Sequence, residues 1–219
     1  MRWSAALTLP LLALTLFGGA GAQSKPPQDP SDVDDSTIRA FKARGLATVV
    51  TQADCGGGSY SVVNSPDGTS VSVLFDSFTA RGSQAGAVRT VCAVRIPLTL
   101  PAGYSMGVFQ MDYRGFARLD AGQSAQLTVG YGVGRQGRGR NFRRGVNGAY
   151  EDEFGFVENI GAGLMKRAGC GEDAVLNLAA TLDLRSNLGS PEAFVTLDTL
   201  DGAARRGVVF HVDLKKCRN

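Results

Sequence analysis

The 219-residue sequence is poor in the side chains that most enzymes use for chemistry. It contains one histidine, His211, and one tryptophan, Trp3. A Ser–His–Asp triad would have to use His211, and no G-x-S-x-G motif presents a serine nucleophile. Asp213 shares a strand face with His211, so a His–Asp pair is possible, but the pattern favours a surface histidine. The C-x-x-C pairs of structural zinc sites are also absent. We therefore predict no catalytic residue, no metal and no cofactor, and the sequence leans against an enzyme.

Long apolar runs are lacking after the first residues. Arg2, the uncharged apolar run 5–17 and the small residues Ala20-Gly21-Ala22 predict a signal peptide over 1–22, and no later run is long enough to cross a bilayer. Residues 23–35 are rich in Pro, Asp, Ser and Gln, which predicts a flexible leader over 23–45. The remaining 46–219 is long enough for one domain. We expect a secreted protein, extracellular or periplasmic, without a transmembrane segment in its mature part.

A strong charge of one sign is lacking too. The net charge is +3, which argues against a general binder of polyanions.

The cysteines predict two disulfides. Cys55, Cys92, Cys170 and Cys217 form an even set in a chain with an export signal. Four cysteines allow three connectivities, which spacing alone cannot separate. Because two lie in each half of the chain, we favour the pairs Cys55–Cys92 and Cys170–Cys217.

Alternation of apolar and polar residues is the dominant pattern. It is clearest over 176–185, where every second residue is Leu or Ala, and it recurs over 60–75, 91–100, 104–119 and 207–215. Ser65-Pro66-Asp67-Gly68 is a turn signal between two of these runs, and Gly107 and Gly115 are expected bulges. Helical periodicity is almost missing, and 158–166 suggests one short helix. The pattern predicts an all-β, antiparallel β-sandwich of immunoglobulin-like or jelly-roll-like layering.

An ordered set of short motifs resembles the pattern of a known family. The set comprises 54–59 (DCGGGS), 65–69 (SPDGT), 74–78 (LFDSF), 91–92 (VC), 100–104 (LPAGY), 112–116 (DYRGF), 170–171 (CG) and 216–217 (KC). Together these resemble the domain-of-unknown-function family DUF4360 of small secreted proteins. The resemblance covers about Leu46–Cys217. It implies secretion and two disulfides, and it brings no catalytic residue or ligand.

The most unusual local feature is basic. Arg135, Arg138, Arg140, Arg143 and Arg144 fall within ten residues that contain no acid. Guanidinium groups on a glycine-rich loop suit carboxylate, sulfate or phosphate. We weigh an anion-binding loop against a solvated loop that pairs with the acidic run 151–153 that follows, and the second is the commoner case.

A cluster of acidic residues suggests a hydrolase as the alternative function. Glu151-Asp152-Glu153 and Glu158 lie close in sequence, and a glycosidase needs two carboxylates facing each other across a cleft. We favour a secreted, non-catalytic β-sandwich that acts as an extracellular or cell-envelope binding or structural module. An anionic glycan or an envelope polymer is its candidate partner. The alternatives are a carboxylate-dependent hydrolase of envelope polymers and a secreted inhibitor or toxin-like module.

Overall fold

The computed structural model describes residues 52–55, 60–82, 86–171, 174–186, 192–197 and 207–218. The predicted signal peptide, the predicted leader and the predicted domain start at Leu46 lie outside these residues. In the part that the structure describes, no helix is long and apolar enough to cross a membrane.

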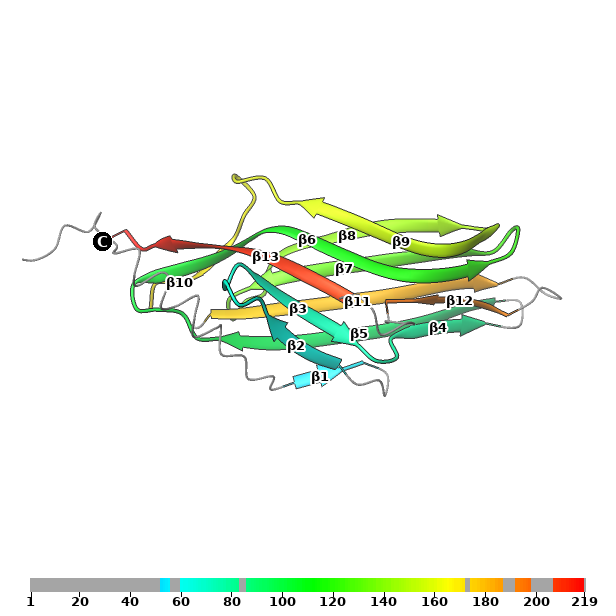
Figure 1. The fold of residues 1–219 in the computed structure, drawn as a ribbon, viewed down its shortest axis with the longest axis horizontal. Coiled ribbons are helices and arrows are strands. Elements are labelled where there is room, and N and C mark those ends of the chain that lie inside the picture. Colours follow the sequence, from blue (N-terminus) through cyan, green and yellow to red (C-terminus); the bar gives the residue numbers. More distant parts are fainter. Residues whose placement is uncertain are drawn as a thin grey trace, which may run out of the picture. The chain divides into compact units, whose positions relative to one another are not determined.

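The described residues form two antiparallel sheets (Figure 1). The five-stranded sheet has the order β1 (Gln52–Asp54), β5 (Gly86–Leu98), β11 (Ala174–Ser186), β7 (Ser124–Val133) and β8 (Arg138–Asn147). The eight-stranded sheet has the order β2 (Tyr60–Asn64), β3 (Ser70–Phe75), β13 (Gly207–Lys216), β6 (Tyr104–Leu119), β12 (Ala193–Thr196) and β4 (Thr79–Gly82). β13 and β12 pair with one edge of β6. β9 (Tyr150–Asn159) and β10 (Arg167–Gly169) pair with its other edge and complete that sheet. The predicted all-β sandwich is confirmed.

Alternation places one face of each sheet in a common core. On β11 the residues Leu176, Leu178, Ala180, Leu182 and Leu184 are each at most 2% exposed, as the sequence predicted. Val208, Phe210 and Val212 of β13 supply the facing layer. Since each strand has period two, burying these residues turns their neighbours outward to water.

Both predicted disulfides are present. Cys55 is bonded to Cys92, and Cys170 is bonded to Cys217. The first joins the end of β1 to β5, and the second joins the segment after β10 to the end of β13. Each bond closes a long loop, which stabilises the fold by restricting the unfolded chain.

Two local predictions are wrong. The segment 158–166 is not a helix: β9 continues to Asn159, and a turn follows in which the Leu164 and Met165 amides donate to the Gly161 carbonyl. The register of β6 against β13 shifts at Phe109, between His211 and Val212, rather than at either glycine predicted as a bulge. Gly115 has a different role, because a Cβ there would lie 1.9 Å from the Thr196 carbonyl oxygen.

Candidate functional site

The outward face of the five-stranded sheet is built from polar and small side chains. The four long strands contribute to it in register, and their side chains form five rungs across the sheet. The short β1 pairs with the other edge of β5 and places Gln52 opposite Arg95 and Asp54 opposite Ala93. From one end these rungs are Arg95–Asn177–Gly132–Gly139, Ala93–Ala179–Gly130–Asn141, Val91–Thr181–Thr128–Arg143, Arg89–Asp183–Gln126–Gly145 and Ala87–Arg185–Ser124–Asn147. We call this set the polar face. Its only large apolar side chain is Val91, which is 49% exposed.

Two hollows lie along the polar face. The first has a volume of about 470 Å³ and occupies the first two rungs, between Arg95 and Asn141. The second has a volume of about 290 Å³ and occupies the last two rungs, around Asp183 and Arg185. The middle rung, with Thr181 and Arg143, separates them. Rungs two residues apart are about 7 Å apart, so the five extend over about 27 Å.

Glycine and alanine make the floor of the larger hollow. Ala93 and Ala179 are exposed, and Gly130 lies beside Ala179 in the register. Asn141 is the cross-strand partner of Gly130, and its Oδ1 would be 2.0 Å from a Cβ placed there. The Asn141 side chain therefore folds across the glycine. Because glycine weakens a strand, its use here is explained by this close approach.

The polar groups around the hollows are held by bonds of their own. Asn177 donates through Nδ2 to the carbonyl oxygens of Gly132 at 3.3 Å and Gly134 at 3.2 Å, which fixes its amide. At the smaller hollow, Arg89 Nε donates to Asp183 Oδ1 at 2.5 Å. Preorganised groups lose little freedom when a ligand binds.

The basic run is not a loop. Only 134–137 forms a turn, closed by the Gly137 amide and the Gly134 carbonyl, while 138–147 is strand β8. Strand alternation separates the arginines. Arg143 lies on the polar face, whereas Arg140 and Arg144 lie on the side of Phe142 and Val146, which pack on the core. Arg135 is exposed in the turn, and Arg138 is in the strand. The predicted anion-binding loop is thus corrected to one arginine on the polar face; anion binding itself stays a prediction.

Arg144 belongs to a link between the two sheets. Its Nη2 donates to Glu158 Oε2 at 2.6 Å, and the Tyr113 hydroxyl donates to Glu158 Oε1 at 2.9 Å. Glu158 is 3% exposed. Burial, followed by the hydrogen bond to Glu158, raises the pKa of Tyr113 well above its usual range. A cation and a hydroxyl donor satisfy the buried carboxylate. The acid that pairs with Arg144 is therefore Glu158 and not a member of the predicted run 151–153.

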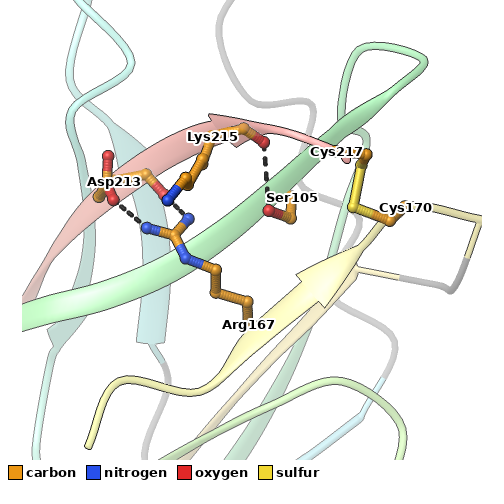
Figure 2. Close-up of a disulfide and its surroundings, with 6 residues drawn as sticks. All are labelled: Ser105, Arg167, Cys170, Asp213, Lys215 and Cys217. Carbon is orange, nitrogen blue, oxygen red and sulfur yellow. Dashed lines mark hydrogen bonds and ion pairs between the residues drawn. A yellow bond between two sulfur atoms is a disulfide. The ribbon is translucent and has the colours of Figure 1, made fainter. Parts of the chain in front are cut away.

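The His211–Asp213 pair that the sequence allowed, but did not favour, is not the one that forms. His211 Nε2 lies 2.7 Å from Asp112 Oδ2 on β6, and Asp112 also accepts from Gln110 Nε2 at 2.9 Å. Asp213 instead pairs with Arg167 of β10, next to the Cys170–Cys217 bond (Figure 2). Asp112 is a diagonal cross-strand neighbour of His211, whose register partner is Gln110, and such neighbours are within reach of long side chains.

The acidic groups weighed for hydrolysis do not face one another. Glu151 and Glu153 project outward from β9, and Glu158 projects into the interior. Among the described residues, no cluster of three or more His, Cys, Asp or Glu is arranged to hold a metal ion. The polar face is therefore the candidate site. The alternating polar residues of β11 were the sequence signal for it, and Arg95 and Asn141 were missed as members.

Comparison with known proteins identifies the family of this chain. It is 24% identical over 168 residues to an uncharacterized secreted protein of Arthroderma benhamiae, which covers 75% of this chain and 68% of that protein. The structure of TmCBM61 in complex with β-1,4-galactotriose matches 75% of this chain and 87% of its own at 9% identity, with a TM-score of 0.29. The enzymatically active domain of tailspike protein 4 of bacteriophage CBA120 matches 77% and 19%, also at 9% identity, with a TM-score of 0.26. Scores this low carry nothing about a ligand. The family model of the domain of unknown function DUF4360 matches residues 53–217, so the chain belongs to this family, as its motifs predicted.

Proposed function

We propose that this protein is a secreted, non-catalytic binding module that holds an extended anionic glycan along the polar face. Export is supported by the predicted signal peptide, by the two disulfides and by the secreted relative. The observation that carries the proposal is the line of two hollows on one sheet face, floored by small residues and edged by amides and guanidinium groups.

The shape of the face suits a chain rather than a compact molecule. Its rungs extend over about 27 Å, which accommodates several sugar units laid end to end. The floor at Ala93, Ala179 and Gly130 leaves room for a ring, and Asn177 and Asn141 present amide groups beside it. Hydroxyl-rich ligands need such donors and acceptors in fixed positions.

The charge of the face favours an acidic ligand. In the five rungs Arg89, Arg95, Arg143 and Arg185 stand with one acid, Asp183, which is already paired with Arg89. β1 adds a second acid beside the rungs, Asp54, in register with Ala93, so the cations still outnumber the acids. Guanidinium groups bind carboxylate and sulfate through two parallel hydrogen bonds. Because the net charge is near neutral, total charge alone attracts polyanions weakly, and the protein is expected to discriminate by where its charges lie.

The test is binding of polygalacturonate by calorimetry, with dextran as the uncharged polymer. Ala179→Phe fills the larger hollow from an exposed position and is expected to weaken polygalacturonate binding at least about tenfold, and Arg95→Gln by a similar factor. Val157→Phe, at an exposed position on the other sheet, is the matched control and should bind like the parent. Equal affinities of Ala179→Phe and Val157→Phe, or equal binding of dextran and polygalacturonate, would contradict the proposal.

A further inference from the structure

A second group of arginines lies on the outward face of the eight-stranded sheet. Phe194 of β12 is paired in register with Arg81 of β4 on one side and with Arg118 of β6 on the other. Each guanidinium carbon lies 5.0 Å from the centroid of the Phe194 ring. The two cations are therefore no farther apart than twice that distance.

The aromatic rings hold this arrangement in place. The Phe116 ring stacks on Phe194 with centroids 5.6 Å apart and 24° between the planes. Phe194 is 9% exposed although it points outward, so the side chains around it cover most of its ring. Cation–π contact orients each guanidinium plane and leaves its N–H edge available to a ligand.

These two cations have no carboxylate partner among the described residues. Glu151 lies opposite Arg118 in the register of β9, yet the two form no ion pair in the described part of the chain. Arg89, Arg144 and Arg167, by contrast, each pair with a carboxylate. Two like charges held together without an ion pair to either of them attract an anion.

We propose that Arg81 and Arg118, held over Phe194, form a second anion-binding site for a carboxylate or sulfate group carried by a polymer. The outward faces of two packed sheets point in opposite directions. A molecule with a site on each face bridges two polymer chains, a consequence that rests on the proposed function of the polar face, whereas the anion site does not.

A single tryptophan reports on this site. Trp3 is the only tryptophan of the sequence and lies in the predicted signal peptide, so Phe194→Trp introduces the sole indole of the mature protein. The indole keeps the cation–π contact. With Ala179→Phe also present, to block the polar face, titration with dextran sulfate is expected to change the indole emission. Inorganic sulfate should need at least about tenfold higher concentration if the polymer is the ligand.

Three further variants distinguish binding at Arg81 and Arg118 from nonspecific attraction of a polyanion to positive charge. Arg81→Gln with Arg118→Gln, in the reporter background, should weaken the response to dextran sulfate at least about tenfold. Arg81→Lys with Arg118→Lys keeps the charge but loses the planar fork, and should recover only part of it. Arg114→Gln removes an exposed arginine from the same face and is the matched control. An unresponsive indole, equal losses in Arg114→Gln and the double Gln variant, or full recovery with Lys would overturn the proposal.

Bridging is measured separately, by light scattering of polygalacturonate mixed with protein. The parent is expected to form large assemblies, and the double Gln variant should bind one chain without assembling. Assembly by that variant would refute bridging and leave the polar face untouched. A reporter that responds, while Ala179→Phe added to the double Gln variant leaves polygalacturonate binding unchanged, would refute the polar face instead.

Discussion

The two sheets share one antiparallel backbone pattern but present opposite surfaces. On the five-stranded sheet, small residues such as Ala179 and Gly130 leave hollows between polar groups. On the eight-stranded sheet, Phe116 and Phe194 stack and arginines lie over them. The comparison teaches that the size of the outward side chains decides the shape of a sheet face. Small side chains leave hollows on it, whereas stacked aromatic rings with arginines over them cover it.

Glycine serves a different purpose in each sheet. At Gly130 the atom nearest to an added Cβ is the end of the Asn141 side chain, at 2.0 Å, and this side chain can rotate away. At Gly115 the nearest atom is the Thr196 carbonyl oxygen, at 1.9 Å, and it belongs to the backbone of β12. One glycine leaves room for a side chain, whereas the other lets two strands approach.

The largest expected effect is a difference in stability between substitutions at these two glycines. Gly115→Ala should lower the free energy of unfolding by about 3 kcal/mol, because the backbone of β12 has to move or its pairing with β6 is lost. Gly130→Ala should change it by less than about 1 kcal/mol. Urea denaturation of both variants measures the difference. Equal losses would mean that the two glycines are under the same constraint.

A smaller effect is expected when the charge of the polar face is made more positive. Asp183→Asn removes the acid of the five rungs and releases Arg89 from a 2.5 Å ion pair. Affinity for polygalacturonate should rise by a factor of about three at low salt, since the pair is partly exposed and screened. Calorimetry at two salt concentrations measures this gain, which should shrink at the higher one. Asp152→Asn, on the other sheet, is the control, and a gain of the same size there would show that only total charge matters.

The smallest effect compares the hairpin turns of the two sheets. In the β2–β3 turn, Asp67 Oδ1 accepts from the Ser65 hydroxyl at 2.5 Å, the Thr69 amide at 3.1 Å and the Thr69 hydroxyl at 2.8 Å. These bonds, that of Ser65 first, lower the pKa of Asp67 from 3.8 to about 2. The β7–β8 turn, 134–137, has no carboxylate.

Because the pKa of Asp67 is lower in the folded state, its contribution to stability is present above pH 3.8 and is lost as the pH falls toward 2. Asp67 is exposed, so the contribution is small. Carboxyl titration by NMR should give the lowered pKa, and Asp67→Asn should reduce the pH dependence of stability in this window. A pKa near 3.8 in the folded protein would contradict the turn geometry.

Much of the fold could be predicted because it depends on local patterns. The alternation over 176–185 identified β11, and the turn at 65–68 identified the β2–β3 hairpin. The basic run was misjudged for a physical reason. Its glycines and arginines have little preference for strands, and pairing of every residue from Arg138 to Asn147 with β7 overrides that weakness.

The candidate sites could not be predicted in the same way. The polar face combines residues of β5, β7, β8 and β11, which are neighbours only after the strands pair. Likewise His211 and Asp112 are 99 residues apart, and Arg81, Phe194 and Arg118 come from three separate strands. Sequence spacing has no information about such neighbours.

By itself the sequence determined the strand periodicity, the presence of two disulfides and the family, because these depend on which residues follow one another and on how many cysteines there are. Only the tertiary structure decided which outward residues share a rung, which arginines are neutralised by a carboxylate and where hollows remain. The physical reason is that strand order and register are set by the burial of the whole core, and that burial is a property of all strands together.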